Sequence, residues 1–118
     1  MSKNPTDYLK HILDECLYIN KALGTSLTKN EFLDNETLKR ATVRSLEIIG
    51  EATKNIPADV RLKWADVNWK NMAGMRDRLI HDYMGVNYSI VWDVVRNKIP
   101  ELTEQITKVL ENERNKPI

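Results

Sequence analysis

An arginine, a histidine and a tyrosine stand close together in the middle of the sequence, at Arg76, His81 and Tyr83. Such a set suits RNA cleavage, because RNA supplies its own nucleophile, the 2′-hydroxyl, and the protein must add only an acid, a base and positive charge. Histidine titrates near neutral pH and can move the proton, whereas arginine stays charged and can hold two phosphate oxygens. Tyr83 could hydrogen-bond the scissile phosphate or the base, and Asp77 could orient either side chain. The residue types therefore indicate a metal-independent ribonuclease site.

An alternative interpretation of the same residues is purely structural. Arg76 could pair with Asp77 or with Glu51 of the preceding helix. His81 could cap the end of a helix, where the helix dipole favours a cation, and Tyr83 could lie at a rim. Residue spacing alone leaves both interpretations open.

The segment that carries these residues, residues 69–83, has apolar positions at helical steps, which predict one buried face. The positions are Trp69, Met72, Ala73, Met75, Leu79 and Ile80. Asn68 can cap this central helix and Gly85 can end it. On an ideal helix Arg76 and His81 point about 140° apart, so they meet only if the arginine bends round or a second copy of the helix completes the site. We therefore expect a homodimer with a shared basic cleft.

The motif R-x4-H-x-Y that the three residues form resembles the signature of the HepT-like proteins, a branch of the HEPN superfamily of small helical ribonucleases. The surrounding run W-x4-GMRDRLIHDY and two flanking blocks, SLEIIGEA at residues 45–52 and GVNYSIVWDVV at residues 85–95, resemble the same family in the same order. The resemblance implies an endoribonuclease that is a homodimer and the toxin of a toxin–antitoxin pair. It also implies a nucleotidyltransferase antitoxin that silences the toxin by adding AMP to the tyrosine at Tyr83.

A second function class stays open beside this one. Some HEPN proteins are non-catalytic helical modules that bind nucleotides or partner proteins, and the low net charge of this chain would suit such a role. With 18 basic and 17 acidic residues the chain is no bulk polycation, so RNA binding needs a local cluster or an oligomer. Loss of cleavage in His81→Ala would separate the two classes.

The composition is that of an ordinary soluble globule, with 42% hydrophobic and 30% charged residues, and we expect one domain over residues 1–118. No apolar run approaches the ~20 residues of a membrane span, and the amino terminus lacks the apolar core of a signal peptide. A single cysteine, Cys16, excludes an intramolecular disulfide and suits the cytoplasm. The two histidines, His11 and His81, are far apart and the carboxylates are dispersed, so we expect no metal and no cofactor.

Periodicity and capping signals predict four long amphipathic helices. They run from Pro5 to about Leu23, from Asn35 or Glu36 to about Asn55, from Trp69 towards Gly85, and from Tyr88 to about Glu113 with a kink or interruption at Pro100. Shorter helical turns are expected at a Thr28–Glu31 capping box and around residues 58–63. The predicted fold class is all-α: an up-and-down, HEPN-like four-helix bundle with short additional helical turns.

A few further residues have a structural interpretation that outweighs a functional one. The first helix has the apolar positions Tyr8, Leu9, Ile12, Leu13, Cys16, Leu17 and Ile19, so Cys16 is expected to be a small buried hydrophobe, and His11, outside that face, a surface residue. Gly50, in the middle of a helix, indicates either close contact with another helix, which we favour, or a tolerated defect. Glu47 and Glu51 share a helix face and could be an acid and base or orient a basic residue, although the solvated interpretation is favoured.

Overall fold

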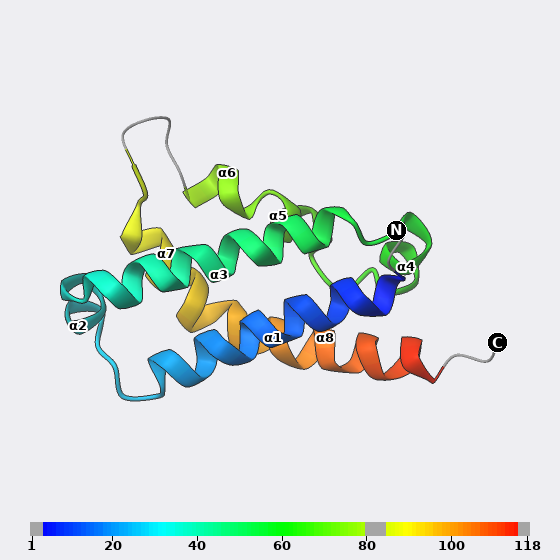
Figure 1. Ribbon diagram of the computed structural model, residues 1–118, viewed down its shortest axis with the longest axis horizontal. Helices are drawn as coiled ribbons and strands as arrows, with labels where there is room; N and C mark the ends of the chain where they lie inside the picture. The colour runs from blue at the N-terminus through cyan, green and yellow to red at the C-terminus, as the bar shows by residue number, and fades with distance from the viewer. Residues whose placement is uncertain (1–3, 80–84, 116–118) are drawn as a thin grey trace.

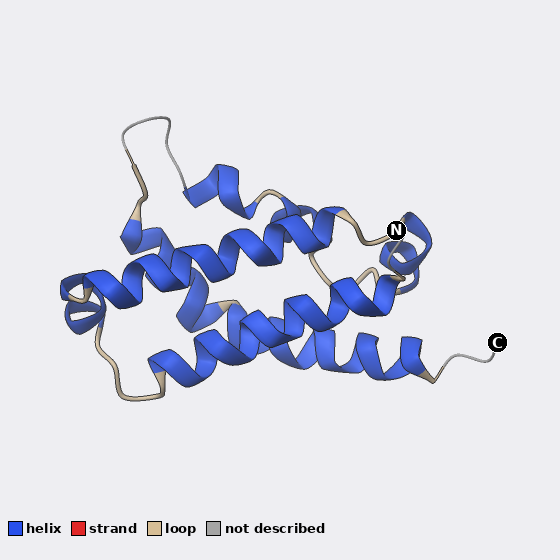
Figure 2. Cartoon of the chain, in the orientation of Figure 1, coloured by secondary structure: helices blue, strands red, loops and turns tan. Residues whose placement is uncertain are grey.

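The computed structural model describes residues 4–79 and 85–115, and this part of the chain is all-α, as predicted (Figures 1 and 2). Its helices are α1 (Pro5–Leu23), α2 (Lys29–Asp34), α3 (Glu36–Lys54), α4 (Ala58–Lys63), α5 (Trp69–Ala73), α6 (Met75–Leu79), α7 (Tyr88–Asn97) and α8 (Ile99–Arg114). The long helix α1 packs against both α3 and α8, and we refer to these three as the bundle. The short helices α5 and α6 pack on the other side of α3, and we refer to them as the arm. None of the described helices is long and apolar enough to cross a membrane.

The predicted caps hold the ends of the first helices. The Asn4 side chain accepts a hydrogen bond from the Asp7 amide, and the α1 helix ends at Gly24, whose φ of 63° is a conformation that favours glycine. Thr28 and Glu31 form the predicted capping box, in which each side chain accepts a hydrogen bond from the backbone amide of the other, at 3.2 and 2.9 Å. These local signals fix where α1 and α2 begin and end.

The apolar face of α1 is narrower than the sequence pattern predicted. Its buried residues follow three- and four-residue steps: Leu9, Ile12, Cys16, Ile19 and Leu23. The sequence pattern predicts Leu17 on this face, but the residue is 50% exposed. The reason is geometric, since Leu17 lies one residue and about 100° beyond Cys16 on the helix. The buried face of α1 is therefore narrower, at the turn that contains Leu17, than the apolar pattern predicts.

Helix α3 buries hydroxyl groups as well as apolar side chains. Thr42 and Thr53 are both fully buried, and each hydroxyl donates a 2.7 Å hydrogen bond to the backbone carbonyl one turn earlier, of Leu38 and Ile49 respectively. Because these hydroxyls are satisfied within the helix, they can face the core at little cost. Apolar periodicity alone did not reveal them.

The prediction of one continuous central helix is wrong. Gly74, with φ −88° and ψ 8°, separates α5 from α6, so two five-residue helices stand where one was expected. Glycine has poor helix propensity, and its amide still donates to the Lys70 carbonyl at 3.0 Å before the chain turns. The predicted continuation towards Gly85 runs through residues 80–84, which lie outside the described residues; Gly85 itself has a φ of 96°.

The predicted interruption of the last helix is confirmed. Helix α7 ends at Asn97, and α8 begins at Ile99 with Pro100 in its first turn, where proline is tolerated. Arg96 ties α7 to the loop after α1: its guanidinium donates to the carbonyls of Gly24 and Leu27 at 2.5 and 2.6 Å. These contacts tie the end of α7, and with it the start of α8, to the loop that follows α1.

Candidate active site

The site begins with a close approach between α3 and α5 at Gly50. A Cβ atom added to Gly50 would lie 3.3 Å from the backbone carbonyl oxygen of Met72, tighter than most real contacts of a Cβ. The glycine therefore lets the α5 backbone rest directly on α3, as the sequence predicted. Since α6 follows α5 after a single residue, this contact also sets how α6 lies along α3.

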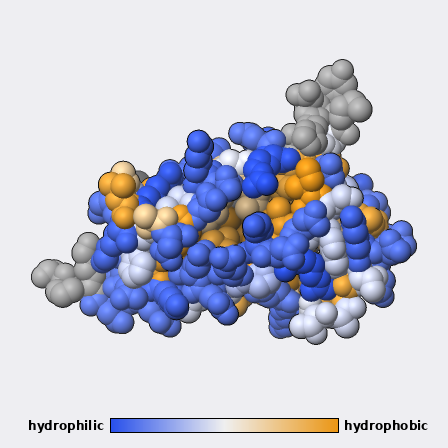
Figure 3. Space-filling model, turned by 180° about the vertical axis from the view of Figure 1, so that it is seen from behind, coloured by the Kyte–Doolittle hydropathy of each residue, from blue (hydrophilic) through white to orange (hydrophobic). Residues whose placement is uncertain are grey.

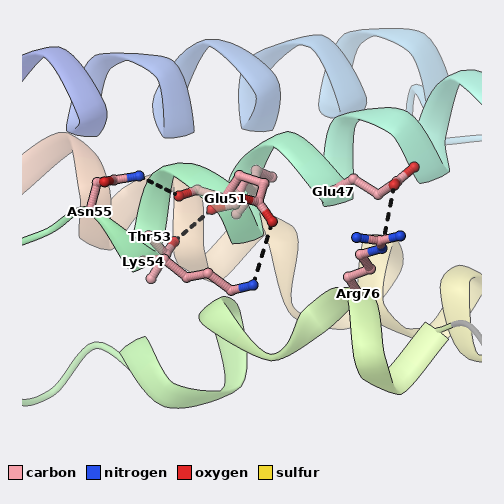
Figure 4. Close-up of polar contacts among 7 residues, drawn as sticks. Glu47, Glu51, Thr53, Lys54, Asn55 and Arg76 are labelled. Atoms are coloured by element: carbon pink, nitrogen blue, oxygen red, sulfur yellow. Dashed lines mark hydrogen bonds and ion pairs between the residues drawn. The ribbon is translucent and has the colours of Figure 1, made fainter.

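Arg76 on α6 faces α3 and meets Glu47 there (Figure 4). Its Nε atom lies 3.9 Å from Oε2 of Glu47, too far for a hydrogen bond but within ion-pair range. The Arg76 side chain is 60% exposed and that of Glu47 26%. An exposed pair of this kind contributes about 1 kcal/mol or less, so the guanidinium can exchange Glu47 for another anion at little cost. A phosphate group is an anion that its planar fork of donors fits well.

The partners that the structural interpretation assigned to Arg76 are not the ones it has. Glu51 pairs instead with Lys54 on its own helix, at 3.4 Å, and is exposed (Figure 4). Asp77 is exposed on α6 and makes no hydrogen bond or ion pair within residues 4–79 and 85–115. Glu47, for which the solvated interpretation was favoured, is the carboxylate that faces the arginine. Sequence reasoning grouped Glu47 with Glu51 because they share a helix face, and only the position of α6 separates them.

His81 and Tyr83 lie outside the described residues. The predicted angle between the Arg76 and His81 side chains therefore stays a prediction. The chain is described again from Gly85, and the Asn87 amide donates to the carbonyl of Leu79, the last residue of α6, at 3.0 Å. Leu79 and Asn87, which stand before and after the segment with His81 and Tyr83, are therefore in contact at the carboxyl end of α6. The same helix carries Arg76.

Two other titratable side chains, Cys16 and His11, lie where their sequence context suggested. Cys16 is buried, and that burial raises the pKa of its thiol to about 12, so the group stays neutral at physiological pH. His11 is exposed on α1. Among the described residues, no three histidine, cysteine, aspartate or glutamate side chains gather where they could hold a metal ion.

Comparison with known proteins shows the family to which the chain belongs. The family model described as "Ribonuclease HepT-like" matches residues 8–109, which is most of the chain. The chain belongs to this ribonuclease HepT-like family. The family match confirms the resemblance read from the Arg76 motif and its flanking blocks. No solved structure matches the chain.

Several relatives of this HepT-like chain carry ribonuclease names. A protein of Caldanaerobacter subterraneus subsp. tengcongensis, named a "Putative RNase", is 50% identical over 113 residues, which are 95% of this chain and 99% of that protein. A "Putative RNase" of Methanocaldococcus jannaschii is 46% identical over 86 residues, covering 73% of this chain and 71% of that protein. The "Probable ribonuclease HepT" of Thermococcus cleftensis is 37% identical over 109 residues, or 92% and 98% of the two chains.

Proposed function

We propose that this chain is an endoribonuclease that cleaves RNA by attack of the 2′-hydroxyl on the adjacent phosphate, without a metal ion. His81 takes the proton of the 2′-hydroxyl and returns one to the departing 5′-oxygen. Arg76 holds the phosphate oxygens and stabilises the charge of the phosphorane. Tyr83 and Asp77 are auxiliary, orienting the phosphate or the two main residues. The products are a 2′,3′-cyclic phosphate and a free 5′-hydroxyl.

The observation that supports this proposal most directly is the state of Arg76. In a chain that belongs to a ribonuclease family, the arginine of the R-x4-H-x-Y motif is exposed, and within the described residues one long ion pair is all that holds its side chain. A structural arginine would be expected to make short hydrogen bonds, as Arg96 does to two backbone carbonyls. The exposure of Arg76 is what we expect of a side chain that binds a ligand instead of another part of the chain.

The proposal extends to the biological setting. We infer that the chain is the toxin of a toxin–antitoxin pair whose antitoxin is a nucleotidyltransferase, and that AMP added to Tyr83 silences it. An AMP group on this residue would add a bulky anion where the RNA phosphate must sit, and it would block the cleft and offset part of the positive charge that RNA needs. The support for this setting is the family to which the chain belongs and the motif that contains Tyr83.

We further propose that the active form is a homodimer in which two copies of Arg76 and His81 line one cleft. The net charge of +1 supports this arrangement, because one copy alone offers little positive charge to RNA. Light scattering at micromolar concentration is expected to give the mass of two chains. A monomer that cleaves RNA at full rate would exclude a composite site.

The test of the activity is cleavage of single-stranded RNA in the presence of EDTA. Wild-type protein is expected to produce 2′,3′-cyclic phosphate ends, and His81→Ala is expected to lose this activity. His11→Ala is the matched control, because His11 is exposed on α1 and has no place in the mechanism. Strict dependence on Mg²⁺ or Mn²⁺ would overturn the mechanism, and unchanged cleavage by His81→Ala would overturn the assignment of the base.

A further inference from the structure

A groove lies between the arm and the α7–α8 pair, on the side of α6 away from the Glu47 contact. Its volume is about 290 Å³. The residues that line it include Asn71, Met72, Met75, Arg78, Lys98 and Gln105. Arg78 stands two residues after Arg76, and on a helix this spacing turns the two side chains about 200° apart. Helix α6 therefore carries one arginine over α3 and a second at the edge of the groove.

The floor of the groove is apolar and suits a flat ring. It includes Met72 and Met75, one on each side of the break at Gly74, with Leu102 of α8 opposite. Methionine is flexible, and its polarisable sulfur packs well against aromatic faces. In Figure 1 α7 and α8 pass behind α3 and α1, and the rear view in Figure 3 shows apolar surface among polar residues there. A nucleobase has the planar face that such a floor would accept.

The rim offers hydrogen-bonding groups of the kind that read base edges. The Asn71 side chain makes no hydrogen bond within the described part of the chain, and the Gln105 amide makes only a long one, 3.4 Å, to the Asp66 carbonyl. Each amide has both donors and an acceptor. Two carboxylates, of Asp66 and Glu101, also line the groove and could accept from exocyclic amino groups of a base.

Two cations complete the rim. Arg78 and Lys98 are both exposed, and neither pairs with a carboxylate anywhere in residues 4–79 and 85–115. A nucleotide needs cations for its phosphate and an apolar surface for its base. The groove offers both, because the two cations stand beside its apolar floor.

We propose that this groove is a subsite for one nucleotide of the RNA, with the base on Met72 and Met75 and a phosphate at Arg78 and Lys98. The inference rests on the proposed function and deepens it. Arg76 and Arg78 belong to the same short helix but point to opposite sides of it, so RNA that contacts both passes around α6 from the cleavage site to the groove.

Binding of a short fluorescein-labelled single-stranded RNA tests the subsite. The parent protein is His81→Ala, so that the RNA stays intact. Adding Arg78→Gln and Lys98→Gln is expected to weaken binding by about tenfold, and to lower the slope of log K against log salt by about 1.4, because each phosphate contact contributes about 0.7. Adding Lys21→Gln and Arg114→Gln is the matched control, with the same charge removed at exposed sites away from the groove.

Photo-crosslinking identifies the contact directly. RNA that carries 5-iodouridine is expected to crosslink to the peptide containing Met72 and Met75. Crosslinks found only in other peptides would overturn the inference, and so would equal RNA affinity in the groove and control variants. If light scattering shows that the groove variant alone changes its oligomeric state, the occupant is a second copy of the chain and the inference is also wrong.

The two proposals fail in different ways. If the wild-type protein cleaves RNA but the groove variant binds RNA as well as the control does, the subsite is wrong and the ribonuclease proposal stands. If the wild-type protein neither cleaves nor binds RNA, the proposed function fails and takes the subsite with it. Circular dichroism of the groove variant is expected to match wild type, because both substituted side chains are exposed.

Discussion

The bundle and the arm are held by different means. In the bundle, long helices bury side chains completely, such as Ile12 on α1, Leu46 on α3 and Ile106 on α8. In the arm, two helices of five residues each are too short to be stable alone, so their order depends on packing against α3. The bundle supplies stability, and the arm presents Arg76 at the surface. Substitutions in the two regions should therefore separate activity from stability.

The largest expected effect on activity is that of Arg76→Ala. Removing a group that stabilises the charge of a transition state lowers kcat by about 10²- to 10³-fold. The free energy of unfolding should change by about 1 kcal/mol or less, since only an exposed ion pair is lost. Initial rates of RNA cleavage and urea denaturation measure the two quantities on the same protein.

Arg40→Ala is the control for this prediction, because Arg40 is an exposed arginine of α3 that pairs with Glu36 in the same helix. It should keep the wild-type rate. If Arg76→Ala and Arg40→Ala reduce cleavage equally, the effect is one of general charge, and the arm is not the catalytic region.

In the bundle the expected result is the opposite. Leu46→Ala removes a fully buried side chain from α3 and should destabilise the fold by about 2 to 5 kcal/mol, through lost burial and a cavity. Cleavage per folded molecule should stay close to wild type at a temperature where the variant is folded. Leu62→Ala is the control, since Leu62 is 78% exposed and its removal should change stability little. A variant that is stable but inactive would show that the bundle takes part in the chemistry.

The contrast between the bundle and the arm also explains which parts of the structure could be predicted from the sequence. The bundle helices follow from local signals: periodicity, the Asn4 and Asn35 caps, and Pro100 at the start of α8. The break at Gly74 could not be predicted from the sequence, because a glycine among helically spaced apolar residues can also be a tolerated defect within a continuous helix. Arm geometry depends on tertiary contact with α3, which no local pattern encodes.

The candidate site divides in the same way. Residue types and the family resemblance selected Arg76, His81, Asp77 and Tyr83. They did not select Glu47 over Glu51, because the choice depends on the side of α3 along which α6 lies. That position depends in turn on the close approach at Gly50, where an added Cβ would lie 3.3 Å from the Met72 carbonyl oxygen. The close approach was predicted, but its consequence for Arg76 was not.

A smaller effect is expected where the arm touches the bundle. Glu47 competes with phosphate for the Arg76 guanidinium, so Glu47→Gln should tighten RNA binding by up to about fivefold, the equivalent of an exposed ion pair. Glu51→Gln is a matched control on the same helix, because Glu51 pairs with Lys54 instead. Fluorescence anisotropy with labelled RNA in the His81→Ala background measures both. Weaker binding in Glu47→Gln would mean that the carboxylate holds the arginine in its working position.

The smallest effect at neutral pH concerns Cys16, in the interior of the bundle. Burial raises the pKa of its thiol from 9.0 to about 12, so the folded state disfavours the thiolate. The stability linked to this group is fully present below pH 9 and is lost as the pH rises from 9 towards 12, because the unfolded chain then releases the proton first. Stability at pH 7 and pH 8 should therefore be the same as far as this group is concerned.

Two measurements check this in the intact protein. At pH 8 the thiol should react with Ellman's reagent far more slowly in native protein than in urea-unfolded protein, since the thiolate is the reactive form and the group is buried. Between pH 9 and pH 10 wild-type protein should lose stability more steeply than Cys16→Ala, in which this titration is absent. Rapid labelling of the native protein at pH 8 would show that α1 opens from α3 and α8 readily, and the contrast between a closed bundle and a surface-held arm would then fail.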